Sequence, residues 1–300
     1  MLDRVVVNGH AKNKRFLITG GNRGLGRAMA ARLVCLGGDV TITSRKLDSA
    51  LVAAIVAEAS LLSPCLDTKP KLRVVQLDLG DLHNVANMAA TYDRPIDVLL
   101  LNAGLSPPQY ETTAQGFESA LGVNCIGHYM LTKNLLASKH FGQPGNRLVV
   151  VTSETFRSVP PLDLPQLLEP VAFGMTESMR YYGRSKLALN TVVAHLTARL
   201  RGHNVSVHAI CPGPVATDIA RRIPAVLKVL SDGMMKTLFQ TGDQAGWPVG
   251  GVSRESGMAP IESLAVLGSL CGLSLQASPS LVQSPPVSRP SLGDYAGDRA

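Results

Sequence analysis

The sequence of 300 residues predicts an α/β fold with a doubly wound, mostly parallel sheet. Three observations support this class. Short apolar runs alternate along the chain with segments of helical periodicity. One run, 96–101, is almost entirely apolar, as expected for a strand that helices cover on both faces. A glycine-rich turn joins the first predicted strand to the first predicted helix, as in parallel strand-helix-strand units.

Composition bounds the organisation of the chain. A hydrophobic content of 45% suffices for one large core, and we expect one α/β domain (15–246) between an N-terminal extension (1–14) and a tail (247–300). Ser, Gly and Pro dominate the tail, which contains no strand-like run. We therefore expect a disordered tail and a sheet without its last strand, and a misjoined reading of the gene is the alternative.

Charge and cysteine usage narrow the functional classes. The net charge of +7, with scattered Lys and Arg, suits an anionic partner such as a phosphorylated cofactor. Aromatic residues make up 4% of the chain and no zinc-finger spacing occurs, which argues against nucleic acid. The five cysteines form no cluster of metal-ligand spacing, so we expect reduced thiols and no metal. Without a secretory signal or an apolar run of about 18 residues, we expect a soluble, cytoplasmic protein with no transmembrane segment.

The first predicted strand, 16–19, leads into the glycine-rich turn 20–26, whose spacing is G-x-x-x-G-x-G. Glycines permit positive φ and a close backbone approach, so the following helix, 27–36, can present its N-terminus to a pyrophosphate. Strand, glycine turn and helix together predict a dinucleotide site. A tight turn without a ligand is the alternative interpretation.

The second predicted strand, 40–43, precedes a helix at 47–62. An NAD site usually places Asp or Glu at this strand end for the ribose 2′-hydroxyl, whereas a 2′-phosphate calls for Arg. Arg45 occupies the strand end and Arg23 the glycine turn, while Asp39 lies at the opposite end of the strand. The sequence therefore favours NADP(H) over NAD(H), unless both arginines are merely solvated.

Two further strands end in candidate cofactor contacts. The third is predicted at 72–77, and Asp78 after it is a candidate for a hydrogen bond to the adenine amino group. Asp78 is equally a candidate, with Asp81, for capping the next helix. The fourth strand runs into Asn102-Ala103-Gly104, small residues against which a cofactor can lie.

A helix predicted at 115–139 contains Asn124, a residue type that competes with the helical backbone for hydrogen bonds. Two explanations are open. Either the helix is kinked and its freed carbonyl, with the amide, holds a water, or the side chain bonds a neighbouring loop. His128, one turn further on, is expected to be a packing or surface histidine without a chemical role.

The fifth predicted strand, 147–152, ends at Ser153. A hydroxyl there faces the crevice where such sheets bind ligands, although a lone Ser is also a common turn or cap residue. The insertion 154–180 is long for a loop in a compact domain and is predicted to be a substrate lid. The sixth strand is predicted at 205–210, and 219–239 is predicted to form a helical flap over the pocket.

Tyr182 and Lys186 are four residues apart in the predicted helix that follows the insertion. They therefore lie on one helix face, one turn apart. An ammonium near a phenol favours the phenolate and lowers a pKa that starts at about 10. Such a phenol suits proton donation to a carbonyl near neutral pH. A chance pair on an exposed helix face is the alternative.

In order and spacing these motifs resemble the short-chain dehydrogenase/reductase family, a Rossmann fold, over about residues 14–240. They are Thr19-Gly20-x-x-x-Gly24-x-Gly26, Asn102-Ala103-Gly104, Asn124, Ser153, Tyr182-x-x-x-Lys186 and Pro212-Gly213. The long interval between Ser153 and Tyr182 is similar to the retinol dehydrogenase and WW-domain oxidoreductase branch, as are Val123-Asn124-x-x-Gly127-His128 and Thr152-Ser153-Glu154; no WW domain is present.

The resemblance implies four catalytic residues: Tyr182 as general acid/base, Lys186 lowering its pKa and binding the nicotinamide ribose, Ser153 polarising the carbonyl, and Asn124 anchoring a relay water. Leu101, where the family often has a first Asn, weakens the adenine-side contacts. The expected cofactor contacts are Gly20, Asn22, Arg23, Gly24, Leu25, Gly26, Arg45, Asp78, Leu79, Asn102, Ala103, Gly104, Tyr182, Lys186, Pro212, Gly213, Val215 and Thr217.

The resemblance implies an NADP(H)-dependent oxidoreductase that transfers a hydride between nicotinamide and an alcohol/carbonyl substrate, with Tyr182 moving the proton. Phe, Met and Leu in the 154–180 insertion favour an apolar substrate. The expected partner is this small molecule, and a homodimer is left open. The alternative is a cofactor-binding scaffold or sensor without turnover, caused by the altered C-terminus.

Overall fold

The computed structural model of the chain describes residues 11–62, 70–162, 174–212, 215–216 and 240–241. The predictions made for the 219–239 flap, the 247–300 tail and a missing last strand fall outside these residues.

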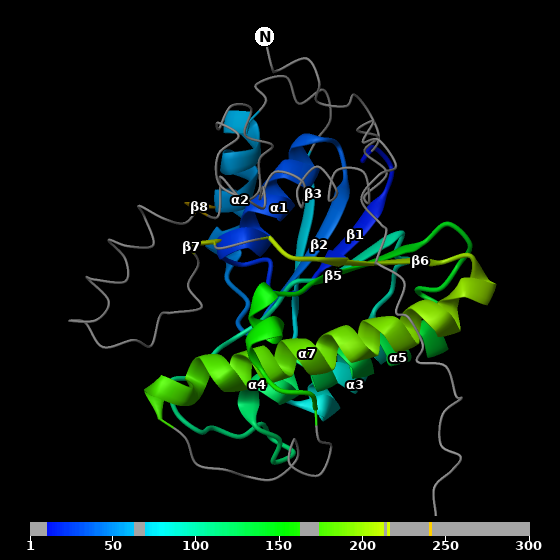
Figure 1. Cartoon of the computed structure of the whole chain (residues 1–300). Helices are drawn as coiled ribbons and strands as arrows, with labels where there is room; N and C mark the ends of the chain where they lie inside the picture. The colour runs from blue at the N-terminus through cyan, green and yellow to red at the C-terminus, as the bar shows by residue number, and fades with distance from the viewer. Residues whose placement is uncertain (1–10, 63–69, 163–173, 213–214, 217–239, 242–300) are drawn as a thin grey trace, which may run out of the picture.

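Six parallel strands form one sheet in the order β3-β2-β1-β4-β5-β6 (Figure 1). Phe16 of β1 aligns with Val40 of β2 on one side and with Val98 of β4 on the other. The strand order reverses at this point, so the connections leave in opposite directions and open a crevice at the carboxyl ends. The strands are β1 (Arg15–Ile18), β2 (Asp39–Ser44), β3 (Lys71–Gln76), β4 (Val98–Leu101), β5 (Arg147–Val151) and β6 (Ser206–Ile210).

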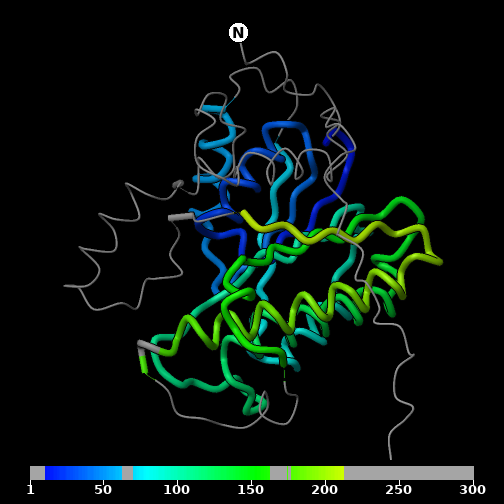
Figure 2. Tube along the Cα trace, in the orientation of Figure 1, coloured from blue at the N-terminus to red at the C-terminus, as the bar shows by residue number. Residues whose placement is uncertain are grey.

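Helices cover both faces of the sheet, which confirms the predicted doubly wound fold (Figures 1 and 2). One face carries α1 (Gly24–Cys35) and α2 (Ser49–Leu62). The other carries α3 (Leu82–Thr91), α5 (His128–Ala137) and α7 (Met175–Leu200). The short elements are α4 (Ser119–Leu121), the π-helix η1 (Gly122–Gly127), the 3-10 helices η2 (Glu154–Ser158) and η3 (Arg201–His203), and the parallel pair β7 (Val215–Ala216) and β8 (Gln240–Thr241).

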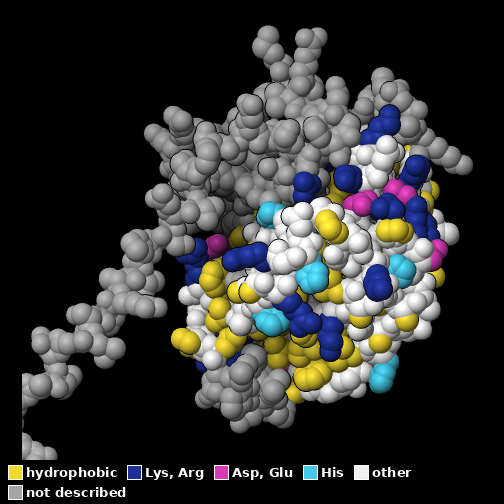
Figure 3. All heavy atoms as spheres, turned by 90° about the vertical axis from the view of Figure 1, so that its right-hand side faces the viewer, with side chains coloured by type: hydrophobic (Ala, Val, Ile, Leu, Met, Phe, Trp, Pro, Cys, Tyr) yellow, Lys and Arg dark blue, Asp and Glu magenta, His cyan; other side chains and the backbone are white. Residues whose placement is uncertain are grey.

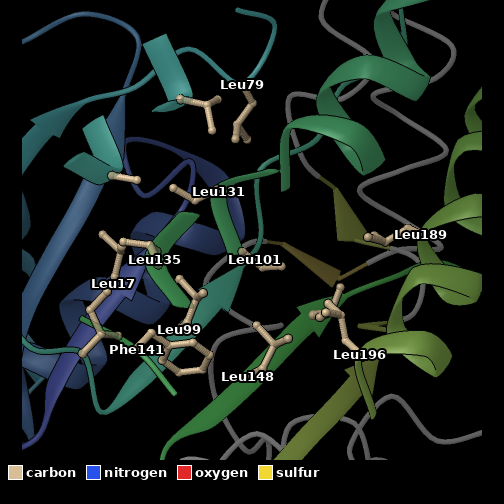
Figure 4. Packing of buried hydrophobic residues seen from close by; sticks show 14 of the residues in the cluster. Leu17, Leu79, Leu99, Leu101, Leu131, Leu135, Phe141, Leu148, Leu189 and Leu196 are labelled. Atoms are coloured by element: carbon tan, nitrogen blue, oxygen red, sulfur yellow. The ribbon is translucent and has the colours of Figure 1, made fainter. Parts of the chain in front are cut away.

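Alternating side chains of the strands feed two separate cores. Ile18 and Leu100 are fully buried beneath α1 and α2. Leu17 and Leu99 point to the opposite face and pack against α3, α5 and α7 (Figure 4). Each such side chain stabilises the fold by roughly 1.5–3 kcal/mol. Burial on both faces explains why β4 is apolar at every position, and β1 and β5 at every position after their first arginine, rather than at every second one.

The helix predicted at 115–139 differs from the observed structure. Helical backbone begins only at Ser119, because the Glu118 carboxylate caps α4 by accepting the N–H groups of Ala120 and Leu121, both at 2.8 Å. Burial raises the pKa of Glu118. The next six residues, 122–127, are π-helical before α5 resumes the α-helix. The predicted start of this helix is therefore wrong, and the π-helical segment shows that the helix is irregular at Asn124, as one of the two open explanations required.

The insertion predicted as a lid, 154–180, is only partly irregular. It opens with the 3-10 turn of η2, and its last residues already belong to α7, which begins at Met175. The predicted loop is therefore wrong for 175–180, which belong to the Tyr182 helix, and the role of the insertion as a substrate lid stays a prediction. Residues 163–173 lie outside the described part of the chain.

Charged side chains are dispersed over the surface, as the sequence predicted. On the face shown in Figure 3, Lys and Arg are spread between His and hydrophobic side chains. Several cations are paired, including Arg15 with Asp97 at 3.0 Å and Arg94 with Asp39. In the described residues, no helix combines the length and apolarity needed to cross a bilayer.

Candidate active site

The ends of β1 and β4 are tied together at the crevice. Thr19 Oγ1 accepts hydrogen bonds from the backbone N–H groups of Asn102, at 2.8 Å, and Ala103, at 3.0 Å. The Asn102 side chain donates in return to the carbonyls of Thr19, at 2.9 Å, and Gly20, at 3.3 Å. The predicted Asn-Ala-Gly contact region therefore lies directly beside the glycine turn.

The glycine turn has the shape that a pyrophosphate requires. Gly20 and Gly24 adopt φ of +65° and +51°, where residues with a Cβ are strained. A Cβ on Gly26 would overlap the Gly20 carbonyl oxygen and lie 2.5 Å from the Asn102 amide nitrogen. At the start of α1, Arg23 makes no side-chain cap hydrogen bond and the first turn contains no acid. The helix N-terminus therefore suits an anion, and these residues fit a dinucleotide.

The carboxyl end of β2 bears Arg45, whose side chain is exposed and whose carbonyl accepts a hydrogen bond from Gln76 at 3.2 Å. Asp39 lies at the other end of β2 and forms a salt bridge with Arg94. The next carboxylate along the chain, Asp48, accepts the Ala50 N–H at the start of α2. Of these charged groups, Arg45 is therefore the one exposed at the carboxyl end of β2, and its contact with a nucleotide stays a prediction.

Asp78 was a candidate for an adenine contact or for capping α3, and the cap is formed by the nearby Asp81 instead. Asp81 is the N-cap residue of α3 and accepts the His83 N–H at 2.9 Å. Asp78 instead accepts the Gly80 N–H at 2.9 Å, in the turn after β3. Its contact with adenine stays a prediction, as does that of the buried Leu79 beside it.

Asn124 is fully buried in the π-helical segment. Its side-chain oxygen accepts the Leu105 N–H at 2.9 Å, and its amide donates to the Leu105 carbonyl at 3.0 Å and to Ser185 Oγ at 2.9 Å. The second explanation, a bond to a neighbouring loop, is therefore confirmed, and the water of the first explanation stays a prediction. A Cβ on Gly104 would lie 3.4 Å from Asn124 Oδ1 and 3.7 Å from Lys186 Nζ, so Gly104 faces both side chains.

Ser153, just after β5, comes together with Tyr182 and Lys186 from the interior of α7. The Tyr182 and Ser153 side chains share a hydrogen bond. Lys186 Nζ lies 5.7 Å from the centroid of the Tyr182 ring and donates to the Val151 carbonyl at 2.9 Å. Tyr182 is 6% and Lys186 2% exposed, which excludes the alternative of a chance pair on a solvated helix face.

The pKa relationship expected between Tyr182 and Lys186 is not the one in this structure. Burial raises the pKa of Tyr182 to about 12, and the Ser153 hydrogen bond offsets only part of that shift. Burial also lowers the pKa of Lys186 to about 8. The physical reason is that the free energy lost on removing a phenolate from water exceeds the stabilisation that the neighbouring groups give it. The Lys186 ammonium itself donates its hydrogen bond to the Val151 carbonyl.

Sequence reasoning missed the role of Gly183. A Cβ there would lie 2.8 Å from the Thr155 carbonyl and 2.9 Å from Val159, so η2 packs directly on α7 next to Tyr182. This contact holds Ser153, the N-cap of η2, beside the phenol. A glycine inside a long helix costs about 1 kcal/mol relative to alanine, and that cost was the available signal.

The sequence analysis also expected no chemistry at His128, which is 1% exposed and hydrogen-bonded at both ring nitrogens to Asn124 and Thr19. Its spacing of four residues from Asn124 was the available signal. Pro212 follows β6, and Val215 begins β7. The remaining predicted contacts, Gly213 and Thr217, lie outside the described residues.

Two consecutive segments of the chain match models of known protein families. Residues 14–160 match the family model described as short chain dehydrogenase, and residues 171–245 match the model described as Enoyl-(Acyl carrier protein) reductase. Retinol dehydrogenase 14 of Homo sapiens is 34% identical over 240 residues, covering 76% of this chain and 70% of its own length. Polyprenol dehydrogenase of Danio rerio is 32% identical over 233 residues, covering 75% and 69%.

Solved structures share the fold. A short chain dehydrogenase from Burkholderia cenocepacia in complex with NADP has a TM-score of 0.58 and 25% identity, covering 79% of this chain and 89% of its own. A 3-oxoacyl-[acyl-carrier protein] reductase from Brucella melitensis in complex with NAD has a TM-score of 0.57 and 20% identity, covering 87% and 90%. Both nucleotides therefore occur among structures of this fold.

Proposed function

Since the chain belongs to the short-chain dehydrogenase/reductase family and resembles its retinol dehydrogenase branch, we propose that it is an NADP(H)-dependent oxidoreductase acting on an apolar alcohol/carbonyl substrate. Membership makes it an oxidoreductase of the Rossmann fold that binds a nicotinamide nucleotide. Two relatives, a retinol dehydrogenase and a polyprenol dehydrogenase, are both named for an apolar alcohol, which supports the substrate class.

One observation carries the proposal: the half-buried Ser153 converges with the buried Tyr182 and Lys186 beside the glycine turn. The cofactor, when bound, supplies or accepts the hydride. Tyr182 donates the phenolic proton to the carbonyl oxygen during reduction and accepts it during oxidation. Ser153 Oγ accepts a hydrogen bond from Thr155 Oγ1 at 3.0 Å, which leaves its single proton for the phenol or, when substrate is bound, for the substrate oxygen.

Lys186 serves this reaction as an anchored cation. With a pKa of about 8 it is mainly protonated at pH 7, and its two N–H groups beyond the Val151 bond are suited to the hydroxyls of a nicotinamide ribose. A Tyr182 pKa of about 12 keeps the phenol protonated, which is the form that a reduction consumes. Asn124 holds the Gly104–Leu105 backbone beside the lysine.

The cofactor contacts form the second part of the proposal. The α1 N-terminus and the turn 20–26 would hold the pyrophosphate, and Arg45 the 2′-phosphate, which is the basis for favouring NADP(H). Asp78 and Leu79 would meet the adenine, and Asn102 to Gly104 the central part of the cofactor. The segment from Pro212 through Gly213 and Val215 to Thr217 would meet the nicotinamide carboxamide.

The direct test has two arms. In a thermal shift measurement, NADPH is expected to stabilise the protein more than NADH, since a ligand that binds the folded state raises its stability. In an assay with a panel of apolar aldehydes and ketones, NADPH consumption is expected. NADPH binding without any turnover would overturn the proposed activity and support a cofactor-binding scaffold or sensor.

Replacing Arg45 with alanine is expected to weaken NADPH about 10- to 100-fold and NADH less than about 2-fold. A charge-assisted hydrogen bond to a phosphate contributes about 1.5–3 kcal/mol, and NADH has no 2′-phosphate. Titration calorimetry with both nucleotides measures the ratio. Arg199→Ala, an equal loss of charge at an exposed site in the last turn of α7, is the matched control. An equal loss for both nucleotides contradicts the assignment.

Replacing Gly183 with alanine is expected to lower kcat about 10- to 100-fold, because the new Cβ pushes the Thr155 carbonyl, and with it Ser153, away from Tyr182. Steady-state kinetics with NADPH measures it. Gly202→Ala, just beyond α7, is the control, since a Cβ there meets nothing within 4 Å. Unchanged kcat in the Gly183 variant would show that this packing does not position Ser153.

We also propose a cytoplasmic location and leave the homodimer as an expectation. The support is the cysteine usage: in the described residues Cys35, Cys125 and Cys211 are free thiols. Free thiols persist in reducing compartments. Fractionation of cells tests the location, and light scattering of the purified protein tests the oligomeric state.

A further inference from the structure

His128 lies at the junction of the π-helical segment and α5, and its ring bridges two parts of the proposed site. Nδ1 lies 3.0 Å from the backbone carbonyl oxygen of Asn124, and Nε2 lies 2.9 Å from Thr19 Oγ1. The backbone N–H of His128 donates to the Cys125 carbonyl, three residues back. The ring, rather than this N–H, therefore takes up the Asn124 carbonyl.

The direction of each hydrogen bond in this chain is determined by chemistry. A carbonyl can only accept, so Nδ1 carries a proton. The ring is buried with the Lys186 cation as its charged neighbour, and both burial and that charge lower its pKa, to about 4, so the imidazole is neutral and Nε2 accepts. Thr19 Oγ1 then donates its single proton to Nε2, since the Leu100 carbonyl is more distant at 3.4 Å.

The lone pairs of Thr19 Oγ1 accept hydrogen bonds from the end of β4, on the side of the site proposed to bind the cofactor. The same oxygen accepts the backbone N–H groups of Asn102 and Ala103. One continuous path therefore runs from the end of β4 through Thr19 and the His128 ring to the Asn124 carbonyl. Because all its members are buried or part-buried, an unmade bond in this path is costly.

Asn124 is consequently held at both of its polar groups. Its amide is bound by Leu105 and Ser185, and its carbonyl is bound by His128. The amide in turn holds the backbone of Leu105 through both its N–H and its carbonyl, and the adjacent Gly104 faces the lysine, since a Cβ added there would lie 3.7 Å from Lys186 Nζ. A rotation of the Asn124 peptide would move this backbone relative to the lysine.

We propose that His128 is a positioning residue of the reaction: by donating from Nδ1 to the Asn124 carbonyl, it sets the Asn124 peptide and the Gly104 backbone against Lys186. The inference rests on the proposed function, since it assigns an effect on turnover. The second part of its role is structural. The hydrogen bond from Thr19 connects the same ring to the ends of β1 and β4, where the cofactor is proposed to bind.

Three variants separate the two halves. His128→Asn places an amide N–H at the position of Nδ1 and loses the Thr19 bond. His128→Gln reaches the position of Nε2 and loses the Asn124 bond. His128→Phe fills the space and loses both. We expect kcat within about 3-fold of the parent for Asn, and roughly 10- to 100-fold lower for Gln and Phe.

A merely structural role would lower the melting temperature of all three variants and leave kcat of the folded protein unchanged. The proposal is overturned if His128→Phe keeps the parent kcat, or if His128→Asn loses as much as His128→Phe.

The parent protein supplies a measurement that needs neither a variant nor a substrate. Nitrogen-15 NMR of the imidazole at pH 7 is expected to show a neutral ring protonated at Nδ1. A ring protonated at Nε2 overturns the inference. If the parent protein binds NADPH but does not turn over any substrate, the proposed function fails on that assay, and this NMR result still decides the hydrogen-bond path.

Discussion

Tyr182→Phe is expected to lower kcat about 1000-fold while the NADPH dissociation constant changes by less than about 3-fold. The substitution removes only the hydroxyl that shares a hydrogen bond with Ser153, and general acid/base catalysis contributes roughly 100- to 10,000-fold. The ring stays beneath Lys186 Nζ, so the cation keeps its aromatic contact. Single-turnover kinetics with saturating NADPH measures the chemical step.

Tyr181→Phe is the matched control for this experiment. It removes the same atom from the adjacent residue of α7, whose ring packs under Arg184. Its kcat is expected to equal that of the parent protein. If the Tyr182→Phe variant kept the parental kcat, the phenol would have no role in the reaction, whatever the cofactor affinity.

Gly26→Ala is expected to abolish measurable NADPH binding and to lower the melting temperature. The added Cβ would overlap the Gly20 carbonyl oxygen and stand 2.5 Å from the Asn102 amide, so the turn must open. Opening it displaces the α1 N-terminus and the end of β4 together, because the Asn102 amide bonds the Thr19 and Gly20 carbonyls. Calorimetry with NADPH and a thermal melt measure the two effects.

Gly202→Ala supplies the control, since it makes the same chemical change where no atom lies within 4 Å of the new Cβ. It is expected to leave NADPH affinity and melting temperature as in the parent protein. NADPH affinity retained in Gly26→Ala would mean that the nucleotide does not depend on this close approach of backbone to backbone.

The strands and the glycine turn were predictable because their causes are local. A strand covered on both faces is apolar at each position, and the observed strands begin and end within two residues of the predicted ones. The helix at 115–139 was mispredicted because its start depends on the Glu118 carboxylate and its π-helical segment on contacts with a distant loop. The hydrophobic periodicity of the sequence indicates neither the Glu118 cap nor the loop contact.

The residue types of the candidate site were likewise readable: a phenol and an amine one helical turn apart, a hydroxyl at a strand end, and glycines before a helix. These patterns follow from the covalent order of the chain and the geometry of regular elements. The pairing of Tyr182 with Ser153 is different, since it depends on how η2 packs on α7 at Gly183.

Burial is the quantity that a linear pattern could not supply. It raises the pKa of Tyr182 and lowers that of Lys186, the reverse of what their spacing alone suggests. It also makes His128, for which the sequence suggested only packing or surface exposure, a neutral bridge between Thr19 and Asn124. Desolvation depends on every element that closes over a side chain, and so it is established only when β1, α5 and α7 have packed together.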